Sequence, residues 1–104
     1  MVVDQPGIDQ LFHALADATR RDIVRRTLGG QLSLSALARA YPMSFAGVQK
    51  HIAVLERAGL VTRERRGREQ LVTAVPASLR AAHGALDELE LIWRDRVARM
   101  DDLL

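Results

Sequence analysis

The chain has 104 residues, no cysteine and a formal net charge of +2 at pH 7. This length allows one domain with one modest core. The lack of cysteine excludes disulfides and thiolate metal sites, and it suits a reducing cytoplasm. No apolar run is long enough to span a membrane, and the N-terminal segment lacks the apolar core of a secretory signal. We therefore expect a single cytoplasmic domain over residues 1–104, with no membrane partner.

The charge is unevenly placed along the chain. Residues 44–68 hold six bases and two acids, whereas residues 84–104 hold six acids and three bases. A basic middle segment favours a polyanionic partner. Every base except Lys50 is arginine, which makes bidentate contacts with phosphate and guanine.

Two helices are predicted in the first part of the chain. The first has apolar residues at helical spacing, namely Ile8, Leu11, Phe12 and Leu15. Asp17 can cap a second helix from Ala18 to Leu28, which Gly29 and Gly30 then stop. The outward arginines of this second helix form a solvated face, or Arg20 or Arg21 near its start contacts a phosphate. The sequence leaves both readings open.

A helix-turn-helix is predicted next. Ser33 can cap a short helix over residues 34–40, and Ser44 can cap a longer one that ends before Gly59. Val48, Ile52 and Leu55 form the apolar stripe of the longer helix. Two helices joined by about three residues, with the second one capped, are typical of this motif. Pro42 lies in the turn, and since proline cannot adopt a positive φ, the sequence does not predict the turn geometry.

The front of this longer helix carries side chains suited to reading DNA. Gln49 is long enough to pair with an adenine edge, and Lys50 can reach guanine or phosphate. His51 contacts a phosphate or fixes the helix by a hydrogen bond to the backbone, and the sequence leaves both open. Ala46 and Gly47 on the same part of the helix are small, which lets a helix approach a surface closely.

A basic hairpin is predicted from Leu60 to Val75, with Gly67 at its tip in a positive-φ conformation. Leu71, Thr73 and Val75 share one face of its second strand. Its arginines are candidates for contact with DNA phosphates or the minor groove: Arg63, Arg65, Arg66 and Arg68. The alternative is that they only protect an edge strand by charge. We favour DNA contact, because the hairpin directly follows the candidate recognition helix.

The last helix is expected to begin at Pro76 and to run for about 25 residues. Its apolar stripe is longer than one subunit can cover, which predicts a homodimer held by the first and last helices. The alternative is that this helix packs only on its own first helix. The candidate dimer residues are Leu79, Leu86, Leu89, Trp93 and Met100.

Three segments of the chain resemble the ArsR/SmtB family of bacterial winged-helix repressors. They are LADATRRDIV (15–24), LSLSALARAYPMSFAGVQKHIAVLERAGLV (32–61) and RERRGREQLV (63–72). The part VQKHIAVLERAGLV is similar to the family's VSRHL-VL--AGLV helix. The resemblance implies that residues 63–68 form the wing. It also implies that the candidate DNA-binding residues of the longer helix are Ser44, Phe45, Ala46, Gln49, Lys50 and His51. It also implies a transcriptional repressor, with autoregulation as a further expectation.

The chain departs from the metal sensors of that family. Residues 36–39 hold no cysteine where those sensors carry a thiol cluster, and the last helix has only His83 as a histidine. His13 is expected at the surface or at an interface. We therefore expect no metal site and no cofactor. No Ser/His/Asp set, phosphate-cradling glycine loop or HExxH motif is present, so no catalytic residue is proposed and an enzyme is not expected.

The sequence thus predicts a mostly α-helical winged helix-turn-helix with five helices plus a wing, dimeric through its first and last helices. The expected function is a DNA-binding transcriptional regulator that acts as a homodimeric repressor on an inverted-repeat operator. The alternative is a winged helix used for protein interaction or dimerisation without DNA binding. The operator sequence and any small-molecule effector are left open.

Overall fold

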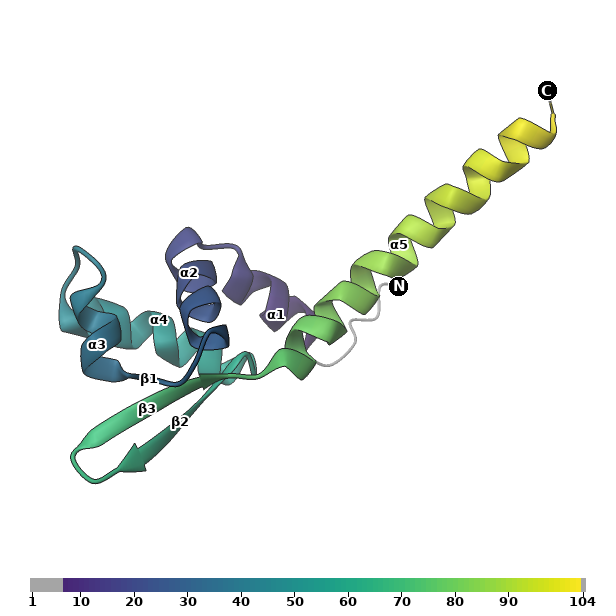
Figure 1. The fold of residues 1–104 in the computed structure, drawn as a ribbon. Coiled ribbons are helices and arrows are strands. Elements are labelled where there is room, and N and C mark those ends of the chain that lie inside the picture. Colours follow the sequence, from purple (N-terminus) through teal and green to yellow (C-terminus); the bar gives the residue numbers. More distant parts are fainter. Residues whose placement is uncertain (1–6, 104) are drawn as a thin grey trace.

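The computed structural model describes residues 7–103, so residues 1–6 and 104 of the expected domain lie outside the described residues. Over this part of the chain, five helices and three strands follow one another (Figure 1). Their bounds are α1 Ile8–Leu15, α2 Ala18–Leu28, β1 Leu32–Ser33, α3 Leu34–Arg39, α4 Phe45–Arg57, β2 Val61–Arg66, β3 Glu69–Ala74 and α5 Pro76–Asp102. The expected fold class is confirmed, and β1 is the one element that the sequence did not predict.

Three of the helices begin at the residues that the sequence predicted. Asp17, Ser33 and Ser44 each accept a hydrogen bond from the backbone N–H three residues later, at 3.0, 3.1 and 3.0 Å. Each has an extended backbone, as an N-cap residue requires. The caps of α2, α3 and α4 are therefore confirmed at side-chain level.

The end of α4 is fixed by Gly59, which has a φ of +76°. The Gly59 N–H donates to the carbonyl of Glu56 at 3.0 Å, and the Leu60 N–H donates to the carbonyl of Leu55 at 2.9 Å. These two bonds form a Schellman motif, which needs a left-handed residue at this position. The motif turns the chain directly from the recognition helix into the first strand of the wing.

The core lies between the first four helices and the base of the sheet. The predicted stripe of α4 is its centre, since Val48, Ile52 and Leu55 are fully buried. The rest of this core is mostly aliphatic, as the small number of aromatic residues requires: Leu11, Ala14, Ile23, Val24, Leu34, Leu37, Leu60, Val61 and Val72. The helix-turn-helix therefore rests on a rigid base, with α4 packed on both α2 and α3.

The sheet has the strand order β1-β3-β2, and all its pairs are antiparallel. β3 is therefore the central strand, and its buried residue is Val72 rather than a member of the face with Leu71, Thr73 and Val75. The reason is that α2 and α3 pack on β3, and the pleat places Val72 on the face opposite to Leu71 and Thr73. Strand β1 pairs with Leu71 and Val72 and covers the second edge of β3. Because β1 has only two residues, the alternating pattern that marks a strand is too short to be seen in the sequence.

Helix α5 leaves the domain body and projects from it (Figure 1). Its start is fixed to the end of α4, because the Val75 N–H donates to the Leu60 carbonyl at 2.9 Å and the Ser78 hydroxyl donates to the Gly59 carbonyl. Its first turns pack on α1 through Leu79 and the buried Ala82. The remaining turns make the molecule 65 Å long but only 28 by 22 Å across.

Candidate nucleic-acid interface

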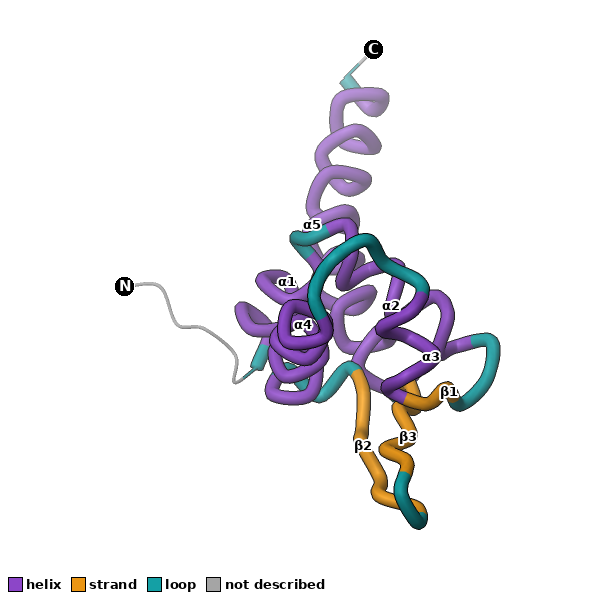
Figure 2. Tube along the Cα trace, turned by 90° about the vertical axis from the view of Figure 1, so that its left-hand side faces the viewer, coloured by secondary structure: helices purple, strands orange, loops and turns teal. Residues whose placement is uncertain are grey.

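The N-terminal half of α4 is open to solvent beside the wing. The chain enters it through a short turn whose residues Tyr41, Pro42 and Met43 contain no positive φ. Ser44, Phe45, Ala46 and Lys50 are exposed, while Gln49 and His51 are partly buried. The predicted residues of this helix are thus brought together on one accessible surface. This surface and the wing lie on the same side of the molecule (Figures 1 and 2). Both are at the end opposite to the C-terminal tip of α5.

The turn before α4 is held by a polar cluster that the sequence reading did not find. The Tyr41 hydroxyl donates to Oδ2 of Asp22 at 2.6 Å, and Nε of Arg26 donates to the same carboxylate at 2.8 Å. The Arg26 guanidinium also lies 5.5 Å from the centre of the Tyr41 ring, in cation–π range. Residues 22 and 41 are far apart in sequence, so no local pattern could predict this contact. It anchors the Pro42 turn to α2.

These contacts change the titration of both partners. Burial, and then the hydrogen bond to Asp22, raise the pKa of Tyr41 to about 12. The hydrogen bonds from Tyr41 and Arg26 lower the pKa of the Asp22 carboxyl below its usual value. The phenol therefore stays protonated and the carboxyl stays ionised over the whole neutral range, which keeps this anchor intact there.

Within residues 7–103, the His51 ring does not make the backbone hydrogen bond considered from the sequence. Its Nδ1 lies 3.3 Å from NH1 of Arg20 and 3.9 Å from Oδ2 of Asp17. Arg20 is not a free arginine either, because its other nitrogens donate to carbonyls at the end of α1. Arg21 likewise donates to the Leu15 carbonyl at 2.7 Å. Arg21 is exposed, as the solvated-face reading expects, whereas Arg20 is partly buried. Both side chains tie α2 to the end of α1.

The wing begins with an arginine that is already paired. Nε and NH2 of Arg63 both donate to Oε1 of Glu56 on α4, at 3.1 and 2.8 Å. The Arg63 side chain is accordingly 26% exposed, against 65% for Arg66 further along β2. In the free chain, Arg63 therefore fixes the wing against α4 instead of pointing freely to solvent.

The other three arginines lie at the exposed tip of the wing. Gly67 has a φ of +64° and begins the two-residue turn, as in a type II′ hairpin, which confirms the predicted tip. Arg66 lies opposite Glu69 in the ladder and 3.5 Å from a carboxylate oxygen of Glu64. Among residues 7–103, no carboxylate pairs with Lys50, Arg65 or Arg68. Arg65 and Arg68 are therefore the wing's unneutralised cations.

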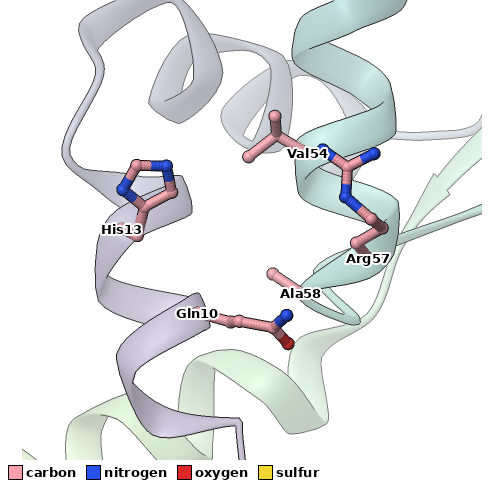
Figure 3. A pocket seen from close by; sticks show the side chains of 5 residues that line it. All are labelled: Gln10, His13, Val54, Arg57 and Ala58. Atoms are coloured by element: carbon pink, nitrogen blue, oxygen red, sulfur yellow. The ribbon is translucent and has the colours of Figure 1, made fainter.

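A shallow hollow of about 80 Å³ lies between α1 and α4. Figure 3 shows its lining, with Gln10 and His13 on α1 facing Val54, Arg57 and Ala58 at the end of α4. The lining side chains come from two segments that are far apart in sequence, so no local sequence pattern indicates this hollow. The hollow lies against the C-terminal part of the recognition helix, away from the exposed N-terminal half.

The predicted dimer residues divide into two groups. Leu79 packs against the domain's own core, whereas Leu86, Leu89, Trp93 and Met100 are exposed in the chain. Leu89 is 66% exposed and Trp93 is 58% exposed, which are high values for large apolar side chains. Val97 lies in line with the predicted stripe, and Ile92 widens this face beyond it. One side of α5 is thus a continuous apolar surface without a partner in residues 7–103.

Within residues 7–103, no three histidine or acidic side chains come close enough together to hold a metal ion. In the same part of the chain, no helix combines the length and apolarity needed to cross a membrane.

A capped helix after a short turn, followed by a basic antiparallel hairpin, defines the class of winged helix-turn-helix proteins. A family model described as a helix-turn-helix domain matches residues 15–64. The HTH-type transcriptional regulator Rv2034 of Mycobacterium tuberculosis is 39% identical over 79 residues, which cover 76% of this chain and 74% of that protein.

Solved structures agree with this likeness. An ArsR-like transcriptional regulator from Rhodococcus sp. RHA1 is 30% identical, with a TM-score of 0.81 over 94% of this chain and 92% of that one. A homodimeric winged helix-turn-helix DNA-binding domain from Mycobacterium bovis shares the fold at 19% identity, with a TM-score of 0.67 over 86% and 91% of the two chains. The chain belongs to the ArsR family of winged helix-turn-helix regulators, and it is a DNA-binding transcriptional regulator.

Proposed function

We propose that this regulator is a cytoplasmic repressor that binds an inverted-repeat operator as a homodimer. The observation that carries the proposal is the placement of the open N-terminal half of α4 beside the unneutralised wing arginines. A helix with this exposure fits the major groove, while a basic hairpin beside it reaches phosphates or the adjacent minor groove. Repression follows where such an operator overlaps a promoter, and autoregulation is the simplest case.

Within this surface the residues take different roles. Gln49 and Lys50 reach base edges, and the small Ser44 and Ala46 let the start of the helix approach the duplex closely. The exposed Phe45 provides an apolar contact to a thymine methyl. Arg65 and Arg68 supply phosphate contacts, which give affinity with little sequence information. Arg66 contributes less because Glu64 already lies beside it, and Arg63 orients the wing through Glu56.

The homodimer is supported by the apolar face of α5. Large exposed apolar surfaces on a small protein mark interaction sites, and this one is continuous with the contact between α5 and α1. A helix of 27 residues is about 40 Å long, so it can meet α1 and α5 of a second copy at once. The Mycobacterium bovis neighbour is described as homodimeric, which agrees with this arrangement.

The comparisons point to regulators and not to an enzyme family. We propose that the protein has no catalytic activity and no metal cofactor, and that any effector is a small molecule. The hollow between α1 and α4 is the place where such a molecule would touch both the proposed dimer element and the recognition helix.

The second candidate function is a winged helix that serves protein interaction alone. The exposed face of α5 favours it, because that surface needs a protein partner whether or not DNA is bound. The unneutralised Lys50, Arg65 and Arg68 favour the first candidate, because a protein-only module has no need for cations without a carboxylate partner on α4 and the wing.

A gel shift with the DNA upstream of the protein's own gene tests the proposal. The protein should retard this DNA in the presence of excess non-specific competitor, and footprinting should show two half-sites about one helical turn, or a multiple of it, apart. In a transcription assay on the same promoter, added protein should lower transcript yield. Retardation that disappears equally with any competitor, together with unchanged transcription, would favour the interaction module instead.

A further inference from the structure

Arg20 joins three helices through its three side-chain nitrogens. Its Nε donates to the Ala14 carbonyl at 2.7 Å, and its NH2 donates to the His13 carbonyl at 3.0 Å, both at the end of α1. Its NH1 lies 3.3 Å from Nδ1 of His51, which belongs to α4. The side chain itself starts on the first turn of α2. The position of the His51 ring on the recognition helix therefore depends on how α1 and α2 are placed.

The contact with Arg20 determines which nitrogen of His51 carries the proton. A guanidinium remains protonated at every relevant pH and has no acceptor. In a hydrogen bond between these two atoms, Nδ1 of His51 is therefore the acceptor, and the proton of the neutral ring lies on Nε2. The Asp17 carboxylate lies 3.9 Å from the same Nδ1, which is beyond hydrogen-bond distance. The same arginine that fixes the ring orientation thus also selects the tautomer.

The Nε2–H of His51 remains accessible from outside the domain. None of the hydrogen bonds within residues 7–103 uses this nitrogen, and every buried side-chain nitrogen or oxygen in that range has a partner. Nε2 is therefore in contact with solvent, in agreement with the 23% exposure of the His51 side chain. The recognition helix thus carries, next to Lys50, a solvent-facing N–H that has no acceptor within residues 7–103.

We infer that Arg20 is a positioning residue for DNA binding: it holds His51 as a neutral Nε2–H donor, and this N–H donates to a DNA phosphate oxygen. The inference deepens the proposed function and rests on it, because it requires α4 to dock on DNA. Arg20 itself does not touch the phosphate. It acts from behind the ring, where its guanidinium is occupied by the end of α1.

Lysine cannot replace Arg20 in this role. One ammonium nitrogen cannot reach two carbonyls of α1 and the His51 ring together, whereas the guanidinium has a separate nitrogen for each. Arg21 provides the matched control, since it donates to the Leu15 carbonyl at the same end of α1 and does not contact His51. A purely structural role at the end of α1 would make the two arginines equivalent.

The tautomer is tested first, on the full chain without DNA. Long-range ¹H–¹⁵N NMR distinguishes the two neutral histidine tautomers, and His51→Gln assigns the His51 signal among the three histidines of the chain. We expect the Nε2–H form in the wild type and in Arg21→Met, and a mixture of tautomers in Arg20→Lys and Arg20→Met. A wild-type His51 in the Nδ1–H form, or an unchanged Nε2–H form in both Arg20 variants, overturns the inference.

The effect on DNA is tested by a double-mutant cycle on the operator. Arg20→Met should weaken binding about tenfold, the size expected for a hydrogen bond to a charged group. His51→Gln places an amide nitrogen close to the position of Nε2 and needs no tautomer selection, so Arg20→Met should change affinity less than about twofold in that background. An equal loss in both backgrounds overturns the inference.

The two experiments separate this inference from the proposed function. If the wild type binds no DNA specifically, the proposed function fails and the phosphate contact fails with it, while the tautomer result still stands by itself. If the wild type binds the operator and Arg21→Met weakens binding as much as Arg20→Met, Arg20 is only a structural link. Circular dichroism of each variant verifies that it is folded.

Discussion

At the residue scale, each polar side chain is defined by its partner more than by its own charge. Arg20, Arg63 and Arg68 look alike in the sequence, yet one links helices, one orients the wing and one is unneutralised. Caps behave differently, because an N-cap finds its partner three residues away in the same segment. That is why the predicted caps agree with the structure, whereas the intrachain partners of the arginines could not be predicted from the sequence.

Ser44→Ala tests the cap at the DNA-facing end of α4. The Ser44 hydroxyl accepts from the Gly47 N–H at 3.0 Å, so its removal should lower the free energy of unfolding by about 1 kcal/mol and fray the first turn. Denaturant unfolding measures the first effect, and operator affinity should fall with it. Ser35→Ala is the control, since Ser35 is exposed within α3 and should change neither quantity appreciably.

Tyr41→Phe tests the anchor of the Pro42 turn. Loss of the hydrogen bond to Asp22 should lower the free energy of unfolding by about 1 kcal/mol at neutral pH, as measured by denaturant unfolding. Thr62→Ser, an exposed change in β2, serves as the control and should leave the free energy of unfolding almost unchanged.

The same anchor has a pH dependence of defined sign. The folded pKa of Tyr41, about 12, lies above its ordinary value of 10.0, so the contribution of Tyr41 to stability is complete below pH 10 and is lost as the pH rises toward 12. Asp22 behaves in the opposite way: because its pKa is lowered, its contribution to stability is present above the ordinary value of 3.8 and is lost as the pH falls below it. Tyr41 is the chain's one tyrosine, so tyrosinate absorbance reports it directly. A midpoint near 10 in the folded protein would contradict the anchor.

At the element scale, the recognition helix and the wing are one mechanical unit. The Schellman motif ends α4 and starts β2, and the pair between Glu56 and Arg63 bridges the same corner. The sequence predicted both elements separately, but the bridge depends on the angle between them. The wing's two faces also differ, since Arg66 shares its face with Glu64 and Glu69 while Arg65 lies opposite Gln70.

The two elements should contribute to DNA binding in different ways. Gln49→Ala should weaken operator binding by about 1–3 kcal/mol and leave binding to random DNA nearly unchanged, because it removes a base contact. Arg68→Ala should weaken both and reduce the slope of log affinity against log salt by about one unit. Arg66→Ala is the matched control, and its effect on the slope should be smaller because Glu64 already neutralises it. Equal slopes for the Arg68 and Arg66 variants would contradict this division.

At the scale of the whole molecule, the two parts of α5 have different roles. Its first turns complete the domain core, and the rest extends the molecule to 65 Å with an exposed apolar face. The recognition surface lies at the other end (Figure 1). A dimer through α1 and α5 would therefore leave both recognition helices free and would set their separation.

Trp93→Ala tests that dimer. Trp93 is exposed in the chain, so its loss should raise the dimer dissociation constant at least tenfold while each protomer stays folded. Sedimentation at several protein concentrations measures the first effect and circular dichroism the second. Leu91→Ala is the control, because Leu91 is exposed on the other side of α5 from the apolar face. A wild type that sediments as a monomer at micromolar concentration would contradict the dimer itself.

The sequence by itself determined the features that depend on neighbours along the chain. The caps at Asp17, Ser33 and Ser44, the turn at Gly67 and the buried stripe of α4 all follow from spacings of a few residues. Local hydrogen bonds and helical periodicity act over those distances, so a single segment carries the whole signal.

Only the tertiary structure decided the contacts between distant segments. Examples are strand β1, the anchor of Tyr41 on Asp22 and the contact of Arg20 with His51. In each case several residues of the chain could form the same type of contact with the group in question. Which partner it meets depends on where the packing of the core places two elements, and that packing is a property of the whole chain.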